Sequence, residues 1–166
     1  CRLSSPELSK GLIAGLTQSG VNVIDLGMLP TPLLYFSLHH LDLDGGIQIT
    51  GSHNPPDFNG FKICLGQASI HGEEIRKVRK IVEAGDFTKG KGRVETKDMI
   101  KPYLEYLEKN IQPGPKKCRV VVDAGNGAGG PVSLEAYRKI GFDVIPLFCE
   151  PDGNFPNHHP DPTIAE

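Results

Sequence analysis

A turn-rich segment between two short apolar runs places the strongest constraint on the fold of this chain. Residues 50–62 read TGSHNPPDFNGFK, and their prolines, asparagines and glycines are typical of a loop. Residues 46–49 lead into the segment and residues 61–65 lead out of it, and both runs have the length of strands. The pattern predicts strand, loop and strand, with the Ser52 hydroxyl offered on the loop for chemistry on its oxygen.

Helical and strand patterns alternate on both sides of this loop. Periodic apolar residues predict helices that each bury one face, among them Leu8, Leu12, Ile13 and Leu16 in the first, Leu33, Leu34 and Phe36 in the second, and Ile75, Val78, Ile81 and Val82 in the third. The first helix would be capped either by Ser5 ahead of Pro6 or by a Ser4–Glu7 capping box, and Gly20 would end it. The predicted helices are 5–19, 31–41, 73–84 and 96–110, and the predicted strands are 21–26, 47–50 and 61–65. This alternation predicts an α/β layered fold.

A second unit is expected after a proline- and glycine-rich linker at residues 112–117. Strand 119–122, the glycine-rich turn 123–130, helix 132–140 and strand 143–148 form one βαβ unit. We therefore divide the chain into domains at residues 1–111 and 112–166. Because a single βαβ unit cannot cover both faces of its sheet, we expect the chain to end inside its second domain.

Composition excludes several classes of protein. The net charge is −2 and the isoelectric point is near 6.3, so no basic surface for nucleic acid is expected. No apolar run is long enough to predict a membrane span. The four cysteines are far apart in sequence, which argues against a metal knuckle or a redox motif. These features favour a reducing, cytoplasmic setting.

Three other motifs suggest different functions. Residues 125–130 read GNGAGG and match the dinucleotide-binding pattern G-x-G-x-x-G, with the acidic Glu150 twenty residues further on. An NAD(P)-dependent oxidoreductase is therefore one alternative. Against it, the negative charge of Asp123 beside the turn would repel a pyrophosphate. The hydrolase elbow G-x-S-x-G is not met around Ser52. Adjacent His158 and His159 predict a polar loop rather than a metal site, because neighbouring histidines rarely point at one ion.

Residues 46–62 closely resemble the phosphoserine loop of the α-D-phosphohexomutases, in a long ungapped match. Residues 2–8 (RLSSPEL), 26–32 (LGMLPTP), 121–127 (VVDAGNG) and 152–162 (DGNFPNHHPDP) are similar to further segments of that family. The resemblance covers essentially the whole chain and is greatest to the bacterial phosphomannomutase/phosphoglucomutase branch. It implies a three-layer αβα first domain with a mixed sheet, followed by the beginning of a second similar α/β domain.

The resemblance also implies roles for four residues. Ser52 would carry the phosphoryl group that moves between the 1- and 6-positions of a mannose or glucose phosphate, and would bind Mg²⁺ through its phosphate. A glucose 1,6-bisphosphate-type molecule would act as activator. Lys62 and Arg2 would add positive charge, and either His53 or Lys62 would exchange the proton of the sugar hydroxyl; we favour His53 as the base and Lys62 as the acid or charge stabiliser.

Some parts of the family pattern are absent from these residues. The chain contains no DGDGDR-type metal loop, no sugar-recognition motif of the family and no opening strand before Arg2. We therefore expect a fragment that cannot complete a mutase cycle alone. A non-catalytic phosphosugar-binding module stays open as an alternative, as do the preferred sugar and the oligomeric state.

Overall fold

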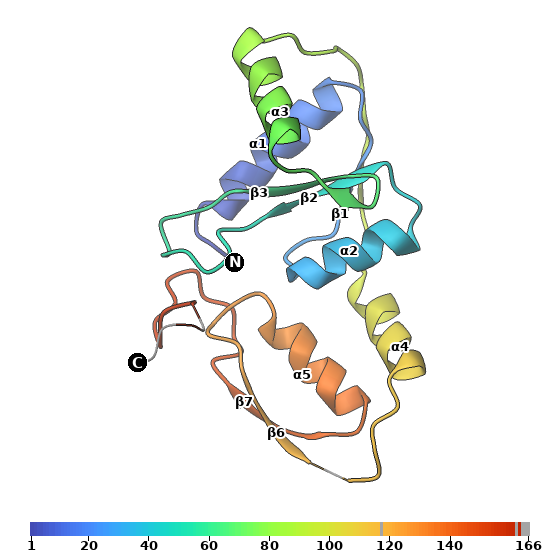
Figure 1. The fold of residues 1–166 in the computed structure, drawn as a ribbon, viewed down its shortest axis with the longest axis vertical. Coiled ribbons are helices and arrows are strands. Elements are labelled where there is room, and N and C mark those ends of the chain that lie inside the picture. The colour runs from blue at the N-terminus through green and yellow to red at the C-terminus, as the bar shows by residue number, and fades with distance from the viewer. Residues whose placement is uncertain (117, 162, 164–166) are drawn as a thin grey trace.

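The computed structural model describes residues 1–116, 118–161 and 163, so Lys117 in the predicted linker and Pro162 in the last motif lie outside the described residues. Two units stand one above the other, with residues 1–96 in the upper unit and residues 119–161 in the lower one (Figure 1). The helices are α1 (Ser5–Gln18), α2 (Thr31–His40), α3 (Glu73–Ala84), α4 (Ile100–Asn110) and α5 (Gly130–Lys139). The strands are β1 (Val23–Asp25), β2 (Gly45–Ile49), β3 (Phe61–Leu65), β4 (Ala68–Ser69), β5 (Val94–Thr96), β6 (Arg119–Asp123) and β7 (Asp143–Leu147).

The upper unit contains both kinds of strand pairing. Strands β2, β3 and β4 form an antiparallel sheet in which Ile47 lies opposite Ile63, whereas β1 and β5 pair in parallel. Helix α2 packs on the antiparallel sheet through Leu34 and Leu38, which form a buried cluster with Cys64. The predicted α/β class is therefore confirmed, as are the strands on either side of the Ser52 loop.

The lower unit is the predicted βαβ unit. Strands β6 and β7 pair in parallel over five residues each, and α5 connects them and packs against both. Cys149, which follows β7, is buried and packs as a small apolar residue.

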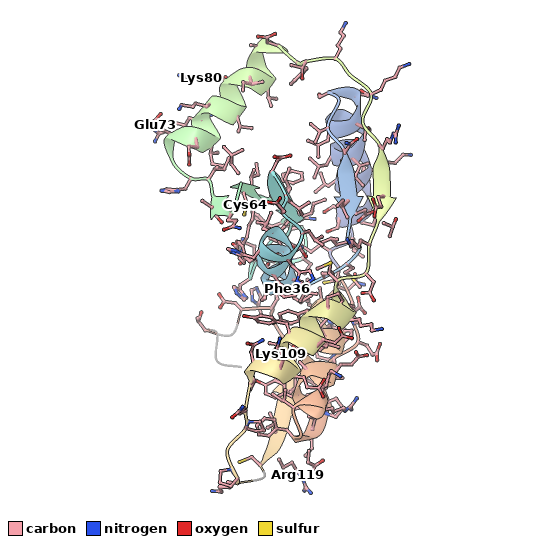
Figure 2. All side chains as sticks on the ribbon, turned by 90° about the vertical axis from the view of Figure 1, so that its right-hand side faces the viewer. Phe36, Cys64, Glu73, Lys80, Lys109 and Arg119 are labelled. Atoms are coloured by element: carbon pink, nitrogen blue, oxygen red, sulfur yellow. The ribbon has the colours of Figure 1, made fainter. Side chains whose placement is uncertain are left out.

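Helix α4 joins the two units, because it contacts both α2 and α5. Leu33 of α2 and Met99 before α4 are fully buried, and they share a cluster with Val132 of α5. Phe36, at the junction of the two units in Figure 2, makes an edge-on contact with Tyr103 at a centroid distance of 5.2 Å. The domain boundary between residues 111 and 112 stays a prediction.

The predicted helix over residues 96–110 is wrong at its beginning. Residues Val94–Thr96 form strand β5, which pairs with Val23–Asp25, and the Lys97 N–H donates to the Asp25 carbonyl. The Asp98 carboxylate then accepts the N–H of Ile100 at 2.9 Å, where α4 begins. The pairing of β5 with a strand some seventy residues earlier is not visible in local sequence, and it overrides the local helix pattern. Strand β1 is also shorter than the predicted 21–26.

Neither predicted cap of α1 forms. Ser4 is the N-cap residue but makes no side-chain capping bond. Instead, the Ser4 and Ser5 hydroxyls both accept hydrogen bonds from Asn59, each at 3.0 Å. The beginning of α1 is therefore held by the Ser52 loop. Gly20, with a φ of 89°, follows the end of the helix as predicted.

Helix α3 has the predicted bounds, but its apolar face is not buried. Ile81 and Val82 are 51% and 60% exposed, and Ile75 and Val78 are also exposed. Figure 2 shows the helix, labelled at Glu73 and Lys80, at the upper end of the molecule. Within the part of the chain that the structure describes, no helix is long and apolar enough to cross a bilayer.

Replacing a glycine with alanine should have opposite effects on the free energy of unfolding at two positions, Gly130 and Gly11. A Cβ at Gly130 would lie 2.8 Å from Cys149 Cα, against backbone that cannot yield, so Gly130→Ala should lower the free energy of unfolding by about 1–3 kcal/mol. Gly11 is exposed in the middle of α1, with open space at its Cβ position. Gly11→Ala should therefore raise the free energy of unfolding by about 0.5–1 kcal/mol. Urea unfolding measures both; equal midpoints for the two variants would contradict this packing.

Candidate functional site

Ser52 lies on the loop that connects β2 to β3. The Thr50 N–H donates to the Gly60 carbonyl at 2.9 Å and closes the loop at its base. Ser52 has a φ of 52°, a left-handed conformation that residues other than glycine rarely adopt. Its N–H donates to the Thr50 hydroxyl at 3.0 Å, which helps to hold that conformation. Ser52 is exposed to solvent.

Two asparagines hold the shape of the loop through side-chain hydrogen bonds. The Asn54 side-chain amide donates to the Gly51 carbonyl at 2.9 Å, so Asn54 closes a tight turn around Ser52. Asn59 reaches the two serine hydroxyls at the beginning of α1. The loop is therefore tied both to itself and to α1.

Arg2 lies beneath the loop rather than open to solvent, and it is only 5% exposed. One terminal nitrogen donates to the Phe58 carbonyl at 2.7 Å and to the Pro55 carbonyl. The other donates to the carbonyls of Ser52 at 3.0 Å and Asn54 at 2.6 Å. Burial lowers the pKa of the guanidinium, and the nearby Asp57 carboxylate opposes that shift. Arg2 therefore binds the loop through four of its carbonyl groups.

His53 contacts the lower unit. Its Nδ1 lies 2.9 Å from the carbonyl oxygen of Pro160, and this oxygen can only accept a hydrogen bond. The proton must therefore be on Nδ1 in this contact, which leaves Nε2 as the basic nitrogen of the neutral ring. His53 thus has a defined tautomer, in which Nε2 can accept a proton.

Lys62 lies on β3, opposite Gln48 of β2, and its side chain is exposed. Since side chains alternate along a strand, Lys62 shares the face of Cys64, on which α2 packs. Gln48 on the same face donates to the Leu29 carbonyl ahead of α2 at 3.2 Å. The structure thus brings Arg2 against the loop that carries Ser52 and His53, and places Lys62 on the strand that leaves this loop.

The described residues do not by themselves fit a magnesium site. Mg²⁺ prefers an octahedral set of oxygen ligands, usually with one or two carboxylates. Among residues 1–116, 118–161 and 163, no group of three His, Cys, Asp or Glu side chains is placed to hold a metal ion. Ser52, the metal ligand expected from the resemblance, supplies a single oxygen atom.

The geometry of the glycine-rich turn disfavours dinucleotide binding. The Asp123 carboxylate accepts the Gly125 N–H at 2.9 Å and the His158 Nε2–H at 3.0 Å. These bonds, the one from His158 first, hold the pKa of Asp123 below its ordinary value, so this carboxylate is negative where a pyrophosphate would bind. The next N–H, that of Asn126, donates to the Phe148 carbonyl. The turn is therefore closed by the protein's own groups.

Three residues of the lower unit reach the site without having been assigned a role from the sequence. The Phe155 ring lies 5.4 Å from the Arg2 guanidinium carbon, and Pro160 contacts His53. Gly153 packs against the first residues of the chain, since a Cβ there would lie 2.5 Å from the Cys1 carbonyl oxygen. Their only signal in the sequence was the family-like segment DGNFPNHHPDP, in which they lie.

Curated relatives match this chain over nearly its whole length, and the match includes both units. A bacterial phosphomannomutase/phosphoglucomutase from Pseudomonas aeruginosa is 47% identical over 165 residues, which cover 99% of this chain and 35% of that protein. A phosphoglucomutase from Neisseria gonorrhoeae is 44% identical over 99% of this chain and 36% of its own length. The chain thus spans little more than a third of the length of these relatives.

A solved structure agrees with the fold. The crystal structure of a phosphoglucomutase/phosphomannomutase family protein from Burkholderia thailandensis matches 98% of this chain and 37% of its own, with a TM-score of 0.92 and 42% identity. Residues 1–89 match the family model described as phosphoglucomutase/phosphomannomutase, alpha/beta/alpha domain I, and residues 101–166 match domain II of the same family. The chain therefore belongs to the phosphoglucomutase/phosphomannomutase family.

Proposed function

We propose that this chain is the phosphoserine-bearing part of a mutase that interconverts hexose 1-phosphates and hexose 6-phosphates. The observation that carries the proposal is Ser52, exposed on a loop whose backbone is tied to Thr50 and Arg2, within the residues that match domain I of the family. The substrate would be a mannose or glucose phosphate, since the relatives are phosphomannomutases and phosphoglucomutases.

The proposed cycle needs two phosphoryl transfers. In the first, the bond between Ser52 Oγ and phosphorus breaks, a sugar hydroxyl oxygen bonds to phosphorus, the sugar hydroxyl proton passes to a base, and an acid donates a proton to Ser52 Oγ. The bisphosphorylated sugar then turns over, and the reverse step returns its other phosphate to Ser52. Because phosphoryl transfer depends on positioning and charge stabilisation, a fixed loop is the main contribution that this chain can make.

His53 and Lys62 are the candidates for proton transfer. The contact between His53 Nδ1 and Pro160 leaves Nε2 basic, which supports His53 as the base. Lys62 would then act as the acid or would stabilise charge. A phosphoserine carries a charge of about −1.5 to −2, so a cationic side chain near the loop would offset part of it.

Magnesium dependence and activation by a glucose 1,6-bisphosphate-type molecule are also part of the proposal. Family membership is consistent with a Mg²⁺ ion, which would supply positive charge at the phosphoserine. Ser52 would provide one ligand, and the others would come from outside the described residues. We also propose a reducing, cytoplasmic setting, supported by the free thiols of Cys1, Cys64, Cys118 and Cys149.

Mass spectrometry tests the proposed function directly. After incubation with glucose 1,6-bisphosphate, the full-length protein should gain the mass of one phosphoryl group, and fragmentation should place it on Ser52. Ser69→Ala, at an exposed serine of β4, should keep the adduct, whereas Ser52→Ala should lose it. An unmodified wild-type protein that still binds the sugar would favour a non-catalytic phosphosugar-binding module, and micromolar NADH binding would favour an oxidoreductase.

A further inference from the structure

The terminal nitrogens of Arg2 are fully used by the protein. A guanidinium group has five N–H donors, four of them on its two terminal nitrogens. Each terminal nitrogen donates to two carbonyl groups of the loop, on Ser52, Asn54, Pro55 and Phe58. A phosphate could engage these nitrogens only by displacing loop carbonyls. The geometry therefore argues against a direct contact between this fork and a sugar phosphate.

The loop needs this donor group for its own conformation. Its four carbonyl oxygens converge on the Arg2 guanidinium in part-buried hydrogen bonds, and carbonyls shielded from water without a donor are costly. One of them belongs to Ser52, whose left-handed φ of 52° persists only if its surroundings hold it. The Ser52 peptide is held on one side by the Thr50 hydroxyl and on the other by Arg2. Arg2 thereby determines the direction in which Ser52 is presented.

The lower unit holds Arg2 in place. The Phe155 ring covers the guanidinium at 5.4 Å, a cation–π distance. Gly153 packs closely against the backbone next to Arg2, since a Cβ at Gly153 would lie 3.1 Å from the backbone nitrogen of Leu3. The same segment provides the Pro160 carbonyl to His53. In Figure 1 this C-terminal segment lies directly below the blue-green loop between β2 and β3, next to the N-terminus.

We propose that Arg2 is a positioning residue, which acts on phosphoryl transfer through the Ser52 loop rather than through the substrate. The segment 153–160 of the lower unit contributes to the same positioning of the loop, because Phe155 holds the guanidinium and Pro160 orients His53. This inference rests on the proposed function for its effect on catalysis. The predicted effect of Arg2 on the conformation of the loop is independent of the proposed function.

Replacing Arg2 with lysine separates positioning from charge. Lysine keeps the positive charge but offers its donors from one point, so it cannot bind four carbonyl groups as a fork. In the full-length protein, Arg2→Lys should lower kcat by about 100-fold, the effect of a misplaced reacting group, and should change KM by less than about threefold. Phe155→Leu should lower kcat several-fold in the same way. The matched control is Arg79→Lys on exposed α3, which should leave both constants unchanged.

Amide hydrogen exchange gives a second measurement that does not require turnover. In Arg2→Lys, exchange at Ser52, Asn54 and Phe58 should be at least about tenfold faster, while the paired amides of β2 and β3 keep the wild-type rates. If Arg2→Lys raises KM with kcat intact, or leaves both the kinetics and the loop exchange unchanged, the proposal is overturned. If the wild-type protein shows neither phosphorylation nor turnover, the proposed mutase function fails, and the exchange rates still decide whether Arg2 positions the loop.

Discussion

Replacing Ser52 with alanine should lower mutase turnover by at least about 10³-fold, with little effect on folding. The change removes the oxygen that we propose as the carrier of the phosphoryl group, and no neighbouring group in the loop supplies an equivalent hydroxyl at the same place. The bonds that hold residue 52, from its N–H to Thr50 and from Arg2 to its carbonyl, belong to the backbone. Alanine can make the same bonds.

The measurement is a coupled assay of hexose 1-phosphate conversion together with thermal unfolding. Because the Ser52 side chain is exposed, the free energy of unfolding should change by no more than about 0.5 kcal/mol. Ser69→Ala serves as the control for loss of an exposed serine hydroxyl. Turnover by Ser52→Ala above a tenth of the wild-type rate would show that another residue carries the phosphoryl group.

Local sequence was sufficient where neighbouring residues determine the structure. The strands on either side of the Ser52 loop, helix α2 and the βαβ unit formed by β6, α5 and β7 follow from apolar periodicity and turn residues, and all are confirmed. The role of Asn54 in loop shape also depends on residues next to it. In these places the local preferences and the tertiary contacts agree.

Prediction from local sequence was wrong or incomplete where contacts with residues distant in the chain determine the structure. Residues 94–96 form a strand because Val23–Asp25 provides the hydrogen bonds, and the Ser4 hydroxyl accepts a hydrogen bond from the distant Asn59 instead of capping α1. The burial of Arg2 depends on Phe155, which is remote in sequence. A pattern along the chain shows which residues could carry charge or a phosphoryl group, but it does not show which carbonyl groups a guanidinium will meet.

The apolar face of α3 illustrates a different limit. Its periodicity predicted the helix with the observed bounds, yet Ile81 and Val82 are more than half exposed. Periodicity states which side chains share a face, whereas burial depends on what packs against that face. Nothing among the described residues covers it, and the proposed function does not use it.

Gly51→Ala should impair both catalysis and stability, because the loop has no room for a methyl group. A Cβ at Gly51 would lie 2.5 Å from the Phe58 carbonyl oxygen and would overlap the Arg2 guanidinium. The φ of Gly51 is not in the left-handed region, so the backbone itself would accept alanine. The loop could admit the methyl group only by separating these carbonyl groups from Arg2, and this would move Ser52.

We expect Gly51→Ala to lower kcat by about 100-fold and the free energy of unfolding by about 1–3 kcal/mol. Gly60→Ala is the matched control at the other end of the loop, where a Cβ would make an ordinary contact of 3.6 Å with the Thr50 carbonyl oxygen. This variant should stay within about threefold of wild-type kcat, as for a surface substitution without strain. Steady-state kinetics and urea unfolding of both variants decide the matter. Equal kcat values for the two would mean that close packing of Arg2 beneath the loop does not determine how Ser52 is presented to the sugar.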